Sequence, residues 1–376
     1  MVEIDIKYEL MKRSIMEISY LGTNRDQEIL EQLKNSSKRV YVYGSAKYAE
    51  VVVEFLQNHD ITVEGILVDE KYLNEKAIVC GLKVYAIERL DDLESINIVI
   101  GFCNVDKARF LRDSFCLLKT NVFLLWEPVE LYHWDEEYIH RNEDVLNEIY
   151  NALADNHSKE ILRLLIEAKL NHRIGKLLDY ADNKQYFNEL TYECDPENEI
   201  FVDCGAYVGD TIEKYCRFTG NRYKKIYALE PDAENFATMK RNLGKTDKID
   251  MVCSGAWNKR DILCFEPDGS SSCIQQSGNK EISVISIDEL VKGEEVSFIK
   301  MDIEGAEIPA LEGARNTITS NIPKLAICCY HKEDDIVDIY RFLKSIEHNQ
   351  KGYKMYLRHH SNGAYETVFY AIPYYK

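Results

Sequence analysis

The chain has 376 residues, a length that predicts two domains, since one domain typically takes about 100–200 residues. Its composition, 45% hydrophobic and 29% charged, is ordinary for a soluble globular protein. The formal net charge of −18 argues against nucleic acid as the main partner, because a phosphate backbone requires a basic surface. The N-terminus lacks the apolar core of a signal peptide, and no run approaches the roughly 18 apolar residues of a membrane span. We therefore expect a cytoplasmic protein without a membrane or nucleic-acid partner.

Eleven cysteines are dispersed along the chain, and none forms a C-x-x-C pair. Several stand in apolar, strand-like runs, among them Cys204, Cys253 and Cys328. This pattern favours buried free thiols over disulfides or zinc ligands.

The N-terminal third alternates strand and helix signals after a helical segment predicted at 1–37. "RVYVYGSAKYAEVVVEFLQNH" is a β-branched run, a glycine turn and an amphipathic helix, and "TVEGILVDE", "INIVIGF" and "TNVFLLW" are further strand candidates. Repeated βα units predict a small parallel sheet at 38–130. The segment resembles the small Rossmann-like domains found on sugar-modifying enzymes. Its turn has Gly44 followed by Ser45 and Ala46, so a scaffold role and a sugar-nucleotide-binding role both stay open.

A helical linker is predicted at 131–195, where "SKEILRLLIEAKL" has apolar residues at helical spacing. The α/β rhythm resumes over 196–376, with strands in "EIFVDC", "KIYALE", "IDMVCSG", "VSFIKMD" and "PKLAICCY" and helices after the first, second and fourth. A final antiparallel pair surrounds Ser361-Asn362-Gly363, with His359 and His360 expected on the surface. The serine- and glycine-rich stretch 267–278 predicts a loop that, with the helices of 150–190, closes over the substrate.

The most informative turn is "FVDCGAYVGDT", in which a strand ends at Asp203 and glycines follow at 205 and 209. Ligands of doubly wound sheets bind at the carboxyl ends of strands. The spacing D-x-G-x-x-x-G differs from the G-x-G-x-x-G of a dinucleotide site, and a carboxylate is unfavourable beside a pyrophosphate. A cofactor with a cationic group and no phosphates fits better, and S-adenosylmethionine is such a molecule.

Glu230 ends the next strand in "YALEPD", where an acid can accept the hydroxyls of a ribose. The alternative is a carboxylate at the start of the following helix, a role that Asp232 also suits.

Three carboxylates, Asp302, Glu304 and Glu307, gather at the end of the strand in "FIKMDIEGAE". Buried carboxylates are costly unless they are used or hydrogen-bonded. We expect one of them to support the following helix and Asp302 to face the cleft. His331, just beyond the next strand, is placed to act as a general base beside Asp302.

Together, "FVDCGAYVGDT", "ALEPD", "SGAW", "SFIKMDIEGAEIPALEGA" and "YHKEDD" resemble the FkbM-type family of S-adenosylmethionine-dependent methyltransferases over roughly 185–373, and "KQYFNEL" resembles members with an extra N-terminal region. The resemblance implies a class I methyltransferase fold and transfer of a methyl group to a hydroxyl of a sugar, glycan or natural product. The implied cofactor-binding residues are Asp203, Cys204, Gly205, Ala206, Tyr207, Gly209, Asp210, Thr211, Glu230, Pro231, Asp232, Ser254, Gly255, Ala256 and Asp302.

The implied catalytic residues are His331, Asp302 and Glu304. Many relatives carry a glutamate two residues before the histidine, where this chain has Cys329, so no carboxylate is available there. A divalent metal is compatible with these residues, but no motif specifies one.

The sequence therefore predicts an S-adenosylmethionine-dependent O-methyltransferase: a class I Rossmann-like sheet, mostly parallel with a C-terminal antiparallel hairpin, preceded by a smaller Rossmann-like domain. Two alternatives stay open, a nicotinamide-dependent oxidoreductase and a non-catalytic scaffold that binds a nucleotide or sugar nucleotide. The acceptor and the formation of a homo-oligomer also stay open.

Overall fold

The computed structural model describes most of the chain. The described residues are 24–74, 76–102, 104–117, 119–125, 134–192, 198–266, 273–274, 280–346, 351–363 and 366–375. Most of the predicted segment 1–37 and of the predicted loop 267–278 lies outside them. Two compact units form, an N-terminal unit of 1–150, 156–183 and 359–366 and a C-terminal unit of 151–155, 184–358 and 367–376. Among the described helices, none has both the length and the apolarity to cross a bilayer.

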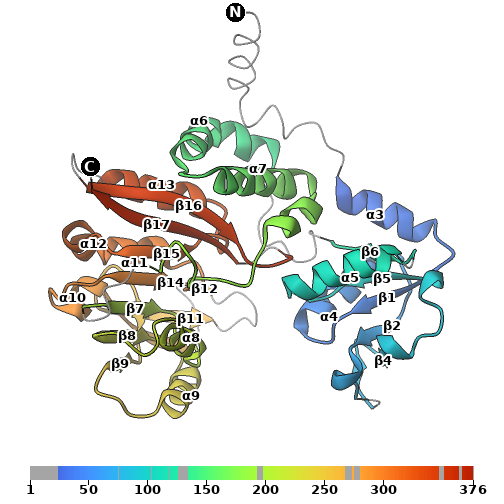
Figure 1. The fold of residues 1–376 in the computed structure, drawn as a ribbon, viewed down its shortest axis with the longest axis horizontal. Coiled ribbons are helices and arrows are strands. Elements are labelled where there is room, and N and C mark those ends of the chain that lie inside the picture. The colour runs from blue at the N-terminus through green and yellow to red at the C-terminus, as the bar shows by residue number, and fades with distance from the viewer. Residues whose placement is uncertain are drawn as a thin grey trace, which may run out of the picture. The chain divides into compact units, whose positions relative to one another are not determined.

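The N-terminal unit is built on a six-stranded sheet of order β3-β4-β2-β1-β5-β6 (Figure 1). Its central pairs are parallel, and β3 joins antiparallel at the edge. The strands are β1 (Arg39–Tyr43), β2 (Val63–Val68), β3 (Ile78–Val79), β4 (Leu82–Ala86), β5 (Ile96–Ile100) and β6 (Asn121–Phe123). The predicted small parallel sheet is thus present, because each β-branched run is followed by a turn and a segment able to return across the sheet.

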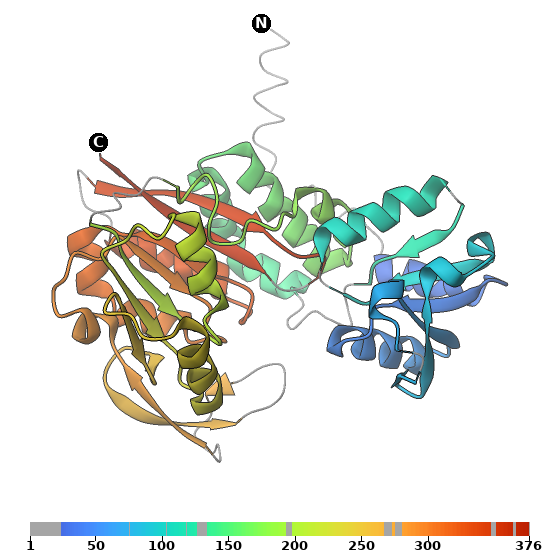
Figure 2. The same ribbon diagram turned by 60° about the horizontal axis from the view of Figure 1, so that its bottom comes forward.

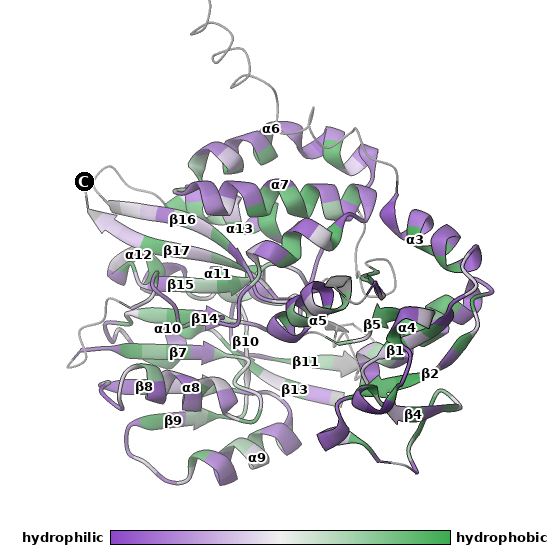
Figure 3. Ribbon diagram, turned by 45° about the vertical axis from the view of Figure 1, so that its right-hand side comes forward, coloured by the Kyte–Doolittle hydropathy of each residue, from purple (hydrophilic) through white to green (hydrophobic). Residues whose placement is uncertain are grey.

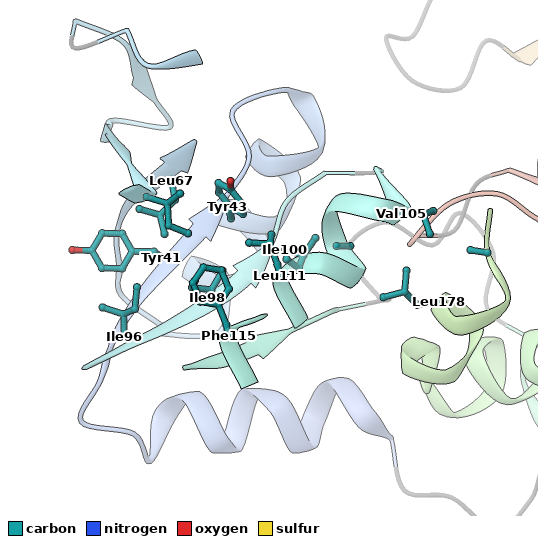
Figure 4. Close-up of a cluster of buried hydrophobic side chains, with 13 residues drawn as sticks. Tyr41, Tyr43, Leu67, Ile96, Ile98, Ile100, Val105, Leu111, Phe115 and Leu178 are labelled. Atoms are coloured by element: carbon teal, nitrogen blue, oxygen red, sulfur yellow. The ribbon is translucent and has the colours of Figure 1, made fainter. Parts of the chain in front are cut away.

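The described part of this unit also contains helices. They are α3 (Arg25–Lys34), α4 (Lys47–Asn58), α5 (Val105–Leu117), α6 (Glu136–Ala152) and α7 (Asn156–Asn171), with 3-10 turns at Glu70–Tyr72, Ile87–Arg89, Leu93–Ser95 and Ile174–Tyr180. One face of the sheet forms a core in which Tyr43, Ile98 and Leu111 pack with Leu178 of the last turn (Figure 4). Asn24 caps α3 by accepting from the backbone N–H groups of Asp26 and Gln27.

The C-terminal unit is built on a seven-stranded sheet of order β16-β17-β15-β14-β7-β8-β9. Its strands are β7 (Ile200–Cys204), β8 (Lys225–Leu229), β9 (Ile249–Val252), β14 (Phe298–Met301), β15 (Lys324–Cys328), β16 (Lys351–His359) and β17 (Thr367–Tyr375). Pairing from β9 through β15 is parallel, and β17 joins β15 antiparallel. This confirms the predicted α/β fold with a C-terminal antiparallel pair. Figure 3 shows hydrophobic residues along β7 and β15, whose residues are all buried.

The helices of this unit follow the strands in βα order. They are α8 (Asp210–Phe218), α9 (Ala233–Leu243), α10 (Ile287–Val291), α11 (Glu307–Glu312), α12 (Arg315–Asn321) and α13 (Asp335–Ile346). Helices were expected after β7, β8 and β14, and all are present. The helix after β15 was not anticipated.

A second, small sheet of order β10-β13-β11-β12 is inserted between β9 and β14 (Figure 2, yellow to orange). Its strands are β10 (Gly255–Ala256), β11 (Asp261–Glu266), β12 (Cys273–Ile274) and β13 (Lys280–Ile285). This sheet was not predicted, because β10 and β12 contain only two residues each and give no strand pattern of their own.

The predicted exposure of two histidines and the predicted burial of one cysteine were wrong. His359 and His360 are buried, at 1% and 5% exposure, and His360 Nδ1 lies 2.8 Å from Oδ1 of Asp182. Cys253 is exposed, whereas Cys204 and Cys328 are buried free thiols as predicted.

Candidate active site

The turn after β7 is shaped by close backbone contacts. Gly205 has φ +83°, and its N–H donates to the carbonyl of Leu229 at 3.1 Å. A Cβ on Gly205 would lie 1.9 Å from the carbonyl oxygen of Asp302, so only glycine lets the ends of β7 and β14 approach this closely. Gly209 has φ +89°, and a Cβ there would press on Leu243 of α9. The two glycines predicted as a cofactor turn are therefore required by the protein's own packing.

Asp203 lies beneath this turn and is fully buried. Its Oδ1 is 3.0 Å from Nζ of Lys300, which is 1% exposed on the neighbouring strand β14. Burial raises the pKa of Asp203 to about 6, although the Lys300 ammonium acts in the opposite direction. The carboxylate that the sequence analysis assigned to a cofactor's cation is thus paired with a lysine of the protein.

Glu230 stands at the end of β8 and is 6% exposed. Its Oε2 accepts from the N–H of Tyr207 and its Oε1 from the N–H of Asp232, both at 2.9 Å. Burial raises its pKa, and these two hydrogen bonds oppose the rise. The Asn235 side chain also acts on Glu230 as a hydrogen-bond donor and lowers its pKa. A carboxylate has about four acceptor positions, so Glu230 is fixed in place with acceptor capacity left.

Asp232 and the segment 254–256 flank Glu230. Asp232 caps α9 by accepting from the N–H groups of Glu234 and Asn235, as the alternative interpretation expected. Ser254 is buried, and Gly255–Ala256 pairs with β13. The remaining predicted cofactor positions lie on the turn and the start of α8: Cys204, Ala206 and Thr211 are buried, Pro231 is half-buried, and Tyr207 and Asp210 are exposed.

Asp302, the first residue after β14, accepts hydrogen bonds from two tyrosines. The hydroxyl of Tyr186 donates to Oδ2 at 2.9 Å and that of Tyr330 to Oδ1 at 3.2 Å. Burial would raise the pKa of Asp302, but Lys300, His331 and the Tyr186 hydroxyl together hold it below its ordinary value. Asp302 is therefore an ionised, half-buried carboxylate with a fixed orientation.

His331 lies among three carboxylates. Its Nδ1 is 2.9 Å from Oε1 of Glu307, and its Nε2 is 3.4 Å from Oδ1 of Asp302 and 3.8 Å from Oε2 of Glu304. Burial lowers its pKa, but these carboxylates outweigh burial and raise the pKa to about 9. At neutral pH His331 is an imidazolium. The structure thus brings together the three residues predicted as catalytic.

Glu304 and Glu307 have different environments within the same turn. Glu307 is fully buried and also accepts from the N–H of Ile303 at 2.9 Å, so it supports the turn that starts α11. The side chain of Glu304 is 51% exposed, and its backbone has φ +54°. Of the three acids, Glu307 has the structural role, whereas the side chains of Asp302 and Glu304 are partly exposed to solvent.

Glu307, His331 and Asp335 present ligand atoms within 4.8 Å of one another, as a metal site requires. Burial, followed by the charge of Glu307, raises the pKa of Asp335 to about 7. Because His331 is protonated at neutral pH, this group is an ion-pair cluster held by the imidazolium charge. A metal would have to displace that proton.

Several residues of this site were missed. Lys300 stands inside the apolar run "VSFIKMD", and a lysine in a buried strand is a detectable signal, since Lys is almost never fully buried unless paired. Tyr186 comes from "KQYFNEL", noted only as a family resemblance, and no local pattern connects it to Asp302. Phe187 anchors this segment, with ring centroids 5.5 Å from Tyr215 and 6.1 Å from Phe201.

The chain is similar in sequence and in fold to known methyltransferases. Residues 203–355 match the Methyltransferase FkbM domain. Hexuronic acid methyltransferase AglP of Haloferax volcanii is 25% identical over 155 residues, which are 39% of this chain and 62% of that protein. The crystal structure of methyltransferase FkbM from Methylobacillus flagellatus is similar over 95% of this chain and 97% of that chain, with a TM-score of 0.67 and 21% identity. At this identity the structural likeness establishes the shared fold.

Proposed function

Because residues 203–355 form an FkbM-type methyltransferase domain with the class I fold, we propose that this protein is an S-adenosylmethionine-dependent O-methyltransferase. We further propose that its acceptor is a hydroxyl of a sugar, glycan or natural-product-like small molecule. The observation that carries the proposal is Glu230, a buried carboxylate fixed by two backbone N–H groups at the end of β8 with acceptor positions to spare.

The residues present fit the cofactor. Glu230 can accept from both ribose hydroxyls. Asp302 and Glu304 give the open edge of the sheet a negative charge that suits an ammonium and a sulfonium. Asp203 contributes indirectly, because it holds Lys300, whose Nζ donates to the carbonyl of Gly205 at 2.8 Å and so fixes the turn.

Bound S-adenosylmethionine supplies an electrophilic methyl group on a sulfonium. The protein's task is then to orient the acceptor hydroxyl and to receive its proton. Asp302 is ionised at neutral pH and is the group ready to accept a hydrogen bond from the acceptor. His331, protonated below pH 9, stabilises the Asp302 carboxylate, and above its pKa it becomes a base itself.

The acceptor class rests on the relative's substrate. AglP is a hexuronic acid methyltransferase, and the aligned stretch spans 62% of it. A sugar is therefore the first acceptor to test. Uronic acids and neutral hexoses are matched probes, because only the former carry a carboxylate besides their hydroxyls.

Calorimetry with S-adenosylhomocysteine tests the cofactor assignment. We expect the wild type to bind and Glu230→Gln to bind at least about tenfold more weakly, since one hydrogen bond to a charged group is worth about 1.5–3 kcal/mol. Glu94→Gln, which changes an exposed acid of the other unit, is the matched control and should bind like the wild type. No binding by the wild type would contradict the proposed function, whereas unchanged affinity in Glu230→Gln would contradict only the ribose assignment.

A further inference from the structure

The two sheets of this chain share one layout at their carboxyl edges. Gly44 directly follows β1 and Asp69 directly follows β2, just as Gly205 follows β7 and Glu230 follows β8. Gly44 and Asp69 are the same distance apart in the sequence as Gly205 and Glu230. The N-terminal sheet therefore places an acid where the C-terminal sheet places the proposed ribose acid.

Backbone contacts repeat as well. The N–H of Gly44 donates to Leu67 O at 2.9 Å, and the N–H of Gly101, which follows β5, donates to Tyr43 O at 2.9 Å. Gly44 has φ +139°, and a Cβ there would lie 2.2 Å from Gly101 O. The same relation holds between Gly205 and Asp302 O. The turns at Gly44 and Gly205 thus both let the end of one strand lie very close to the end of the neighbouring strand.

This edge is the switch point of the N-terminal sheet. From β1 the chain adds β2 and β4 on one side and then β5 and β6 on the other. In open α/β sheets the crevice at such a point, outside the carboxyl ends of the strands, is where ligands bind.

Asp69 is held there with one oxygen available. The hydroxyl of Tyr43 donates to Oδ1 at 2.6 Å, and Nζ of Lys107 donates to the same atom at 2.5 Å. Within the described part of the chain, no donor reaches Oδ2. Burial acts to raise the pKa of Asp69, but Lys107 and Tyr43 outweigh it and lower the pKa, so the carboxylate is ionised. Figure 4 shows Tyr43 standing at the upper side of the buried cluster of this unit.

The surroundings suit a nucleoside. Asp69 and Lys107 line an open hollow together with Glu70, Lys71 and Glu88. Two large aromatic side chains stand exposed nearby in sequence, Tyr72 at 66% and Phe110 at 63%, and Nζ of Lys107 is 5.7 Å from the Phe110 ring centroid. Exposed aromatic faces are where bases stack.

We propose that the carboxyl edge of the N-terminal sheet binds a ribonucleotide, with Oδ2 of Asp69 accepting the ribose hydroxyls and the Gly44 turn, at the start of α4, facing the phosphates. The turn lacks the further glycines of the G-x-G-x-x-G dinucleotide fingerprint, and the start of α4 presents backbone N–H groups that suit a phosphate. The residues of this site all belong to the N-terminal unit, whereas those of the proposed methyl-transfer site belong to the C-terminal unit.

Calorimetry of the full chain with ADP, UDP, GDP and CDP tests the proposal. We expect at least one diphosphate to bind with Kd below about 1 mM. Asp69→Asn should weaken that binding at least tenfold, and Glu230→Gln should leave it unchanged. The 2′,3′-dideoxy form of the same diphosphate should bind the wild type at least tenfold more weakly, a measurement that needs no variant.

Three results would overturn it: no binding of any of the four diphosphates, equal affinity for the ribo and dideoxy forms, or loss of binding in Glu230→Gln rather than Asp69→Asn. Binding of S-adenosylhomocysteine by the same samples is a separate readout. The nucleotide site can therefore fail while the methyltransferase proposal stands, and the reverse also holds.

Discussion

The Lys300 ammonium lies 3.0 Å from Oδ1 of Asp203, and the two side chains are 1% and 0% exposed. They are directly paired neighbours on β14 and β7. The same ammonium donates to the carbonyls of Cys204 and Gly205, at 3.3 and 2.8 Å. Its charge also helps to lower the pKa of Asp302. One buried lysine thus links the glycine turn, the acid beneath it and the acid at the open edge.

Replacing Lys300 by methionine should be strongly destabilising. The change leaves Asp203 without its cation, and removing one partner of a buried ion pair costs about 3–5 kcal/mol. Denaturant unfolding of the C-terminal unit measures the loss. Asp203→Asn combined with Lys300→Met should recover most of it, because no uncompensated charge then remains. A single variant as stable as the wild type would contradict the pairing.

Gly205→Ala should be far more damaging than Gly220→Ala, although both glycines have positive φ, at +83° and +62°. At Gly220 a Cβ meets nothing within 4 Å, so only the left-handed backbone costs energy, about 1–2 kcal/mol. At Gly205 the same atom would lie 1.9 Å from a carbonyl oxygen, and we expect more than about 4 kcal/mol or failure to fold. Thermal unfolding of the two variants measures the difference, and equal losses would contradict the close approach of β7 and β14.

The architecture was predictable because its strands are β-branched runs separated by glycine turns. Five of the seven strands in the C-terminal sheet follow from "EIFVDC" through "PKLAICCY". The small inserted sheet was not predicted, because two of its strands, β10 and β12, contain only two residues each. The helix α13 was not predicted, because the polar run "HKEDD" obscures its start.

Within the site, the acids at strand ends were predictable from position, because parallel strands bring their carboxyl ends to one edge. Their partners were not. The sequence suggests that the Asp203 carboxylate is available to a ligand, because nothing in it shows that Lys300 lies beside Asp203. That pairing depends on the register between β7 and β14. Tyr186 reaches Oδ2 of Asp302 from a segment more than a hundred residues earlier in the chain, a contact that tertiary structure alone reveals.

Tyr186→Phe should destabilise the C-terminal unit by about 2 kcal/mol, the usual value of a hydrogen bond to a charged group. Its hydroxyl donates to Oδ2 of Asp302 at 2.9 Å, and loss of that donor should also raise the pKa of Asp302. Tyr223→Phe is the control, because the contact of its hydroxyl is a thiol at 3.6 Å and its loss should cost less than about 0.5 kcal/mol. Equal losses in the two variants, measured by urea unfolding, would contradict a special role for Tyr186.

His331 should make the protein less stable as pH rises from 7 to 9. A histidine whose folded pKa is raised from 6.5 to about 9 stabilises the fold fully below pH 6.5, and that contribution disappears as pH rises through 9. Its size is on the order of 3 kcal/mol. Asp335, with a pKa raised from 3.8 to about 7, also makes the protein less stable as pH rises, but its effect falls between about pH 4 and 7, below the range in which His331 acts.

Urea unfolding at half-unit pH steps measures this slope, and His331→Asn is the comparison. The variant lacks the titrating imidazole, so its unfolding free energy should change less between pH 7 and 9 than that of the wild type. Histidine NMR gives an independent readout, in which the His331 ring should titrate near pH 9. A ring that titrates near its ordinary value, together with parallel stability profiles, would show that the three carboxylates do not hold His331 in its protonated form.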